Sequence, residues 1–134
     1  MDKRIKIFFL ILVLFQGLHS IEEYIGRLWS VFPPAKFLSG LVSPNLENGF
    51  LTINIGLFIF GLWCWLIPIN RNYIFTRGLI WFWIFIEIIN GAGHPVWALS
   101  EKAYVPGVAT APILLLIAIY LSFLLLKENS KTGI

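Results

Sequence analysis

Charged side chains are scarce in this sequence. Only 13% of its 134 residues are Asp, Glu, Lys or Arg, whereas 58% are hydrophobic and 16% aromatic. Soluble domains carry about twice this charged share, so too few charges are present to cover a soluble surface. The single cysteine excludes an intrachain disulfide framework, and the high hydrophobicity excludes intrinsic disorder. We therefore expect one domain whose main solvent is lipid.

Long apolar runs predict four membrane-spanning helices. No charge occurs between Glu47 and Arg71 or between Lys102 and Lys127, and each stretch exceeds the about 20 residues that a helix needs to cross the hydrocarbon core. Two further runs are interrupted by charges. The first of them is interpreted as a retained helix, because no small residue precedes a cleavage point in the way a signal peptide requires. We expect an all-α membrane protein, a four-transmembrane-helix bundle with helices at about 5–25, 50–70, 73–91 and 105–126 and an outer interfacial loop at 26–49.

Basic residues are unevenly distributed along these spans. Because Lys and Arg collect on the cytoplasmic side of a membrane, they predict that both termini are cytoplasmic. The predicted location is the bacterial cytoplasmic membrane. The net charge of +3 reflects this asymmetry, so no nucleic-acid partner is expected. The basic residues on the predicted inner side are Lys3, Arg4, Lys6, Arg71, Arg77, Lys127 and Lys131.

Three polar residues lie together near the end of the first predicted helix. At 1.5 Å per residue, His19 lies about 21 Å from Ile5 along the helix, and Glu22 and Glu23 lie about 26 Å from it. That is the outer third of a core about 30 Å thick. At 100° per residue, the two glutamates fall about 60° and 40° to either side of His19. One helix face therefore carries all three.

The third predicted helix carries polar residues at the same depth. Counted from Tyr73, Glu87 lies at about 21 Å, Asn90 at about 26 Å and His94 near the outer boundary. Charges inside a bilayer cost about 2.5–3.5 kcal/mol each, so their presence points to function. Two glycines and Pro95 surround His94, and we expect them to end the helix early and leave His94 on a turn.

These residues form three short motifs in a fixed order. His19 to Glu23 reads H-x-x-E-E, Asn90 to His94 reads N-x-x-x-H, and residues 104–107 read Y-x-P-G. The ordered set resembles the HXXEE-domain family of small integral membrane proteins, which is functionally uncharacterised. The resemblance supplies no substrate and no reaction. It implies that the family's signature positions are His19, Glu22, Glu23, Asn90, His94, Tyr104, Pro106 and Gly107.

Two imidazoles and several carboxylates at one depth suit a divalent metal such as zinc or iron. The predicted ligands are His19, Glu22, Glu23 and His94, with Glu87 as a further carboxylate. A glutamate that does not bind the metal would act as general base on a metal-bound water. This hypothesis makes the protein a metal-dependent, hydrolase-like enzyme acting on a membrane lipid or another apolar substrate. The predicted catalytic residues are Glu22, Glu23, Glu87, Asn90 and Tyr104, of which Asn90 and Tyr104 orient ligands or stabilise an oxyanion.

Two other interpretations use the same residues. The cluster is a structural network in one of them, although interhelical hydrogen bonds in membranes average only about 0.6 kcal/mol. In the other it is a proton- or ion-coupled site, since intramembrane Glu and His often relay protons. Because four helices are few for transport, that interpretation requires a homo-oligomer.

Overall fold

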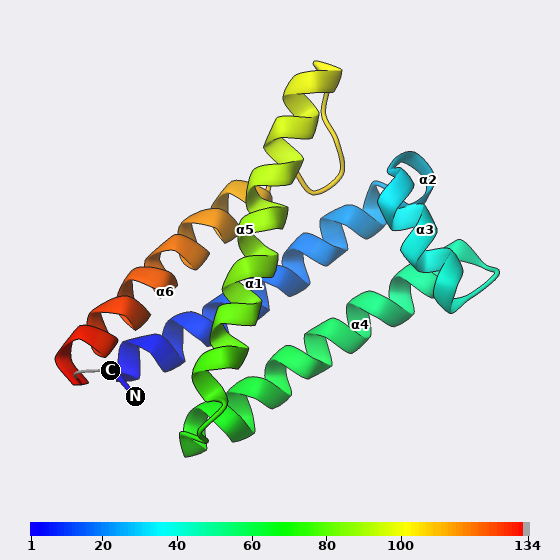
Figure 1. The fold of residues 1–134 in the computed structure, drawn as a ribbon. Coiled ribbons are helices and arrows are strands. Elements are labelled where there is room, and N and C mark those ends of the chain that lie inside the picture. Colours follow the sequence, from blue (N-terminus) through cyan, green and yellow to red (C-terminus); the bar gives the residue numbers. More distant parts are fainter. Residues whose placement is uncertain (133–134) are drawn as a thin grey trace.

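A computed structural model describes residues 1–132, and all the regular structure in this range is helical (Figure 1). Four of its segments are long and apolar enough to cross a membrane: Lys3–Ile25, Leu46–Ile69, Thr76–Glu101 and Ala111–Ser130. The predicted all-helical fold with four candidate spans is therefore confirmed. In chain order the elements are α1 (Lys3–Ile25), α2 (Leu28–Val31), α3 (Pro33–Val42), α4 (Leu46–Cys64), the π-helical turn η1 (Trp65–Ile69), α5 (Thr76–Glu101) and α6 (Ala111–Thr132).

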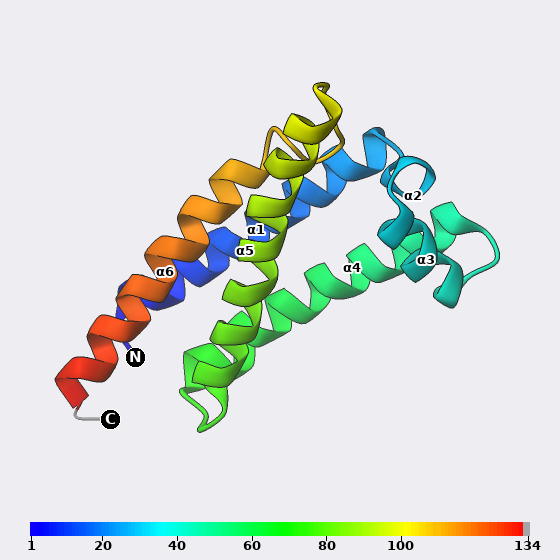
Figure 2. The same cartoon turned by 45° about the horizontal axis from the view of Figure 1, so that its top comes forward.

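The long helices share one end, which we call the terminal end. There the Asp2 N–H donates to Glu128 Oε1 at 2.6 Å, and Lys6 Nζ donates to the Asn70 carbonyl at 3.1 Å. The start of α1, the end of α6 and the turn between η1 and α5 are therefore neighbours. From that turn α4 and α5 diverge in both views, while α6 runs alongside α1 (Figure 1, Figure 2). The opposite end, which we call the site end, carries α2, α3 and the connection from α5 to α6.

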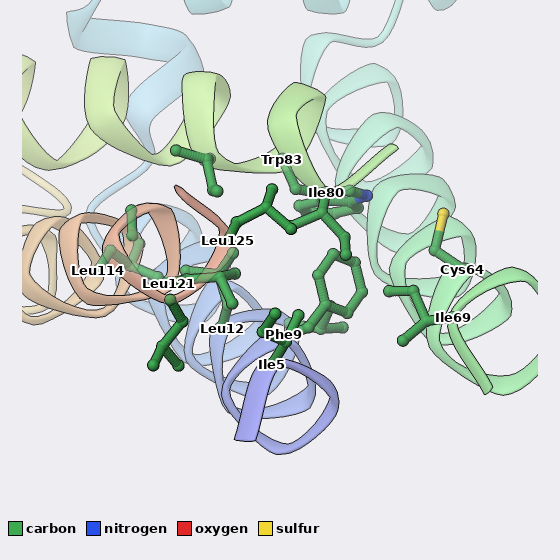
Figure 3. Packing of buried hydrophobic residues seen from close by; sticks show 14 residues of the cluster. Ile5, Phe9, Leu12, Cys64, Ile69, Ile80, Trp83, Leu114, Leu121 and Leu125 are labelled. Atoms are coloured by element: carbon green, nitrogen blue, oxygen red, sulfur yellow. The ribbon is translucent and has the colours of Figure 1, made fainter. Parts of the chain in front are cut away.

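The main hydrophobic core joins α1, α5 and α6 with the end of α4 and η1 (Figure 3). Phe9 and Trp83 meet edge to face in it, with ring centroids 6.1 Å apart. Large apolar side chains elsewhere on the helices stay exposed, as Phe85 (65%) and Leu116 (68%) do. Exposed residues of this kind suit a lipid-facing surface, because lipid tails are as apolar as leucine.

Helix α5 continues ten residues beyond its predicted end, so the prediction of a helix stop at residue 91 and a turn around His94 is wrong. Gly91 serves close packing instead, because a Cβ added to it would lie 2.6 Å from the Leu115 Cβ of α6. Pro95 lies inside the helix. It removes only one backbone donor, a loss that membrane-spanning helices tolerate.

Helix α6 begins at Ala111, six residues after its predicted start at 105. Gly107 has φ +92°, a left-handed backbone conformation that is incompatible with regular α-helix, so α6 cannot begin before it. Its carbonyl accepts a hydrogen bond from the Ala111 N–H at 3.0 Å. The segment 104–110 is therefore an irregular loop, and the predicted bounds 105–126 move to Ala111–Thr132.

The predicted outer loop contains two short helices and the start of α4. Pro33 and Pro34 open α3, because proline fits the first turn of a helix. Asn45 caps α4 through an Asn48 N–H to Oδ1 hydrogen bond of 3.0 Å, so α4 starts four residues before the predicted position 50. The backbone of Ser39 on α3 contacts Gly49 on α4 where any side chain would clash.

Candidate metal centre

Two histidines and one glutamate meet between α1 and α5. His19 and Glu23 lie one turn apart on α1 and share a face, and His94 comes from α5. Glu23 Oε1 lies 3.2 Å from His19 Nε2 and 3.1 Å from His94 Nε2. All three residues are buried, and one ligand atom from each lies within 4.8 Å of the others. The structure thus brings together three of the four residues predicted as metal ligands.

The second ring nitrogen of His19 has a fixed partner. The Thr110 hydroxyl donates its single hydrogen to Glu22 Oε2 at 2.5 Å. The same oxygen lies 2.7 Å from His19 Nδ1 and must therefore accept from an Nδ1–H. This hydrogen-bond network assigns the Nδ1–H tautomer to neutral His19 and leaves a lone pair on its Nε2.

Two imidazole nitrogens at the centre are buried without a hydrogen-bond partner, His19 Nε2 and His94 Nδ1. In the tautomer that Thr110 imposes, His19 Nε2 and Glu23 Oε1 face each other as two acceptors at 3.2 Å. Such a contact is unfavourable unless a proton or a metal ion lies between the two atoms. Buried polar atoms without partners are rare in folded proteins, so the centre is suited to a cation.

Gly107 closes the centre from the side of the α5–α6 loop. A Cβ added to Gly107 would lie 2.7 Å from His94 Cε1 and 2.8 Å from His19 Cε1. Real Cβ atoms do not approach this closely, and the φ of +92° is also unfavourable for any other residue. The glycine of the Y-x-P-G motif is therefore required both by the backbone of the loop and by the two imidazoles.

Glu22 lies outside the group of three and holds the α5–α6 loop. It accepts hydrogen bonds from Tyr104 Oη at 2.8 Å, the Ala109 N–H at 2.9 Å and the Thr110 N–H at 3.0 Å, besides the Thr110 hydroxyl. A carboxylate so close to the first turn of α6 also faces the positive end of that helix. The contacts make Glu22 a positioning residue for the loop, and through Thr110 for the His19 ring.

Tyr104 is mostly exposed, and its hydroxyl donates to Glu22 rather than to either histidine. Desolvation, together with the hydrogen bond and the negative charge of Glu22, raises the pKa of the Tyr104 phenol. The phenol therefore stays protonated at neutral pH and keeps donating. Tyr104 belongs to the same loop-holding contacts as Glu22.

Glu87 belongs to a second polar network, which joins three helices. It is fully buried on α5, and the Gln16 amide, turned so that its nitrogen faces α5, donates to both carboxyl oxygens at 2.9 and 3.1 Å. Ser20 Oγ lies 3.2 Å from the Gln16 amide oxygen and 2.8 Å from Asn54 Oδ1 on α4, and its single hydrogen can be donated to either of these oxygens. The sequence interpretation missed Gln16 and Ser20 because uncharged polar residues do not interrupt an apolar run. Their spacing of four residues on α1 was the available signal.

Asn90 lies between the two networks on α5. It follows Glu87 by three residues, on the same side of the helix, and it lines a cavity that also contains His94. The residues predicted as catalytic are therefore divided. Glu23 is at the centre, Asn90 lines the cavity, Glu87 is buried in the second network, and Glu22 and Tyr104 hold the loop.

Comparisons with known proteins agree with this arrangement of motifs. The model of a family described as a protein of unknown function with HXXEE motif matches residues 8–121. That range contains the centre, the loop and both polar networks. Neither the curated proteins nor the solved structures contain a match.

Proposed function

This chain belongs to the HXXEE family of proteins of unknown function, and we propose that it is an integral membrane protein with a metal-dependent, hydrolase-like activity. The proposed substrate is a lipid or another apolar molecule that reaches the centre from the outer leaflet. His19, Glu23 and His94 would hold a divalent ion, zinc or iron.

The proposed orientation places both termini in the bacterial cytoplasm and the site end toward the outer face. Basic residues support it, because they gather at the terminal end and mark the cytoplasmic side of membrane proteins. Lys6 reaches the α4–α5 turn there, and Arg77 pairs with Glu128 at 3.2 Å. The metal centre would then lie in the outer half of the membrane.

One observation carries the metal proposal: His19, Glu23 and His94 are buried with one ligand atom of each within 4.8 Å of the others, and His19 Nε2 has no hydrogen-bond partner there. Two imidazoles and one carboxylate are a ligand set of catalytic zinc sites, which use three protein ligands and keep one position open. A histidine that binds a metal is usually oriented by a hydrogen bond from its other ring nitrogen. In this protein His19 Nδ1 makes that hydrogen bond with Thr110, whose hydroxyl is held by Glu22.

A divalent ion, when bound, would supply an activated water and polarise a carbonyl group. Side chains of this protein would orient the substrate and accept the proton. Asn90 faces the cavity beside His94 and would orient a substrate oxygen. Glu87, three residues before Asn90 on α5, is the proposed proton acceptor. Gly107 and its loop keep water away from the imidazoles.

Metal analysis of the purified protein tests the proposal. We expect the detergent-solubilised protein, stripped with a chelator and reloaded with zinc or iron(II), to retain about one ion per chain after desalting. Inductively coupled plasma mass spectrometry measures the content. Reloaded protein that retains no ion would rule out the metal-dependent function.

Proton-coupled transport is the second candidate, and the network of Glu87, Gln16, Ser20 and Asn54 favours it because it connects three helices through buried polar groups. It requires a homo-oligomer. In that case protein in liposomes should dissipate an imposed pH gradient, and Glu87→Gln should abolish the flux. A pH-sensitive dye inside the liposomes reports it. Wild-type liposomes as tight as protein-free ones would contradict transport.

A further inference from the structure

A cavity of about 330 Å³ adjoins the metal centre on the side of α5. His94 and Asn90 contribute its polar atoms next to the centre. Phe32, at the end of α2, and Trp97 form its far wall, with ring centroids 4.7 Å apart. The cavity lies at the lower end of the size range of small-molecule sites, and His94 belongs both to it and to the group of three ligands.

The lining of this cavity is uncharged. None of the described residues around it is a Lys, Arg, Asp or Glu, and most of the lining is aromatic or aliphatic. A phosphate group inside the cavity would find no Lys or Arg side chain to pair with, and burying it without such a partner would be costly. Ser100 also lines the cavity, but its hydroxyl donates to the Trp97 carbonyl. The other polar partners, the Asn90 amide and the His94 imidazole, suit a neutral carbonyl group.

We infer that this cavity receives the acyl chain of an uncharged ester lipid, such as an acylglycerol, with its ester group at Asn90 and His94. The inference rests on the proposed function, whose substrate class it narrows to neutral lipids and from which it excludes phospholipids. Ile89 and Val96 form the outward side of the cavity and are exposed. An acyl chain can therefore enter sideways from the bilayer, without crossing the polar centre.

Gly93 offers a way to fill the cavity without disturbing the packing. It lines the cavity, and a Cβ added to it would meet nothing within 4 Å. Gly78, on the same helix, is equally open and lies outside the cavity. Gly93→Leu and Gly78→Leu are thus matched variants that differ in whether the new side chain enters the cavity.

The experiment uses the full-length protein in lipid nanodiscs and a monoacylglycerol with a diazirine at the end of its chain. We expect photolabelling of the wild type and of Gly78→Leu, with the label on α5 or Phe32, and about a tenfold weaker signal for Gly93→Leu. Unlabelled monodecanoylglycerol should compete, and decanoyl lysophosphatidic acid should not. Mass spectrometry of the digested protein locates and quantifies the label.

Any of three results would overturn the inference: no labelling of the wild type, labelling of Gly93→Leu at the wild-type level, or equal competition by the phosphate-bearing lipid. The competition series uses only the wild type, so it decides the question even if Gly93→Leu folds poorly. Metal content measured on the same samples separates the two proposals. A wild type that binds metal but is not labelled contradicts the inference and leaves the proposed function intact.

Discussion

The His19→Ala, His94→Ala double variant is expected to lose metal binding, from about one ion per chain to background. The reason is geometric. Glu23 alone would remain of the three residues whose ligand atoms lie within 4.8 Å of one another, and one buried carboxylate does not hold a divalent ion against competition from water. Inductively coupled plasma mass spectrometry after reloading measures the loss.

Gln16→Leu is the control for this variant. It removes a buried polar side chain from the same helix as His19 without touching the group of three. We expect it to bind metal as the wild type does, even if its stability falls. A double variant that retains the metal would show that other residues hold it.

Thermal unfolding separates loss of the metal from loss of the fold. A ligand present at one hundred times its dissociation constant stabilises the native state by about 2.7 kcal/mol. Added metal should therefore raise the unfolding temperature of the wild type and of Gln16→Leu and leave that of the double variant unchanged. An equal rise in all three proteins would mean that the metal acts elsewhere.

Hydropathy and helix geometry predicted the four spans and most of the centre. His19 and Glu23 lie on one face because of their spacing, and they do meet His94 from the third span. The role of Glu22 did not follow from spacing. At 100° per residue Glu22 and Glu23 flank His19, but only the packing of α5 and of the following loop decides which neighbour each carboxylate meets. Glu23 meets His94, and Glu22 meets Thr110.

The errors at the ends of α5 and α6 run in opposite directions. The predicted end of α5 treats its glycines and Pro95 as helix breakers, which is their usual effect in water, whereas the predicted start of α6 at residue 105 carries the helix through Pro106 and Gly107. In α5 the glycine at 91 allows α6 to pack closely, and the helix continues through Pro95. Gly107 does interrupt regular helix, because its backbone is left-handed, and no other residue fits there because two imidazoles occupy the space of a side chain. A sequence shows where the glycines are but does not show which neighbour each one accommodates.

Gly107→Ala is expected to destabilise the protein strongly, through both its backbone and its packing. A non-glycine residue in left-handed backbone costs about 1–2 kcal/mol, and overpacking a buried site costs about 1–3 kcal/mol more. The added Cβ would lie 2.7–2.8 Å from both histidine rings, so the ring positions must change if the loop does not. We expect a large fall in unfolding temperature together with loss of metal binding.

Gly93→Ala provides the matched comparison, because its Cβ meets nothing within 4 Å and its backbone is helical. Replacing a helical glycine by alanine stabilises by about 0.5–1 kcal/mol, so the two variants should shift the unfolding temperature in opposite directions. Circular dichroism during heating measures both. A Gly107→Ala protein that unfolds like the wild type and keeps its metal would mean that residues 104–110 do not close over the imidazoles and do not shield the centre.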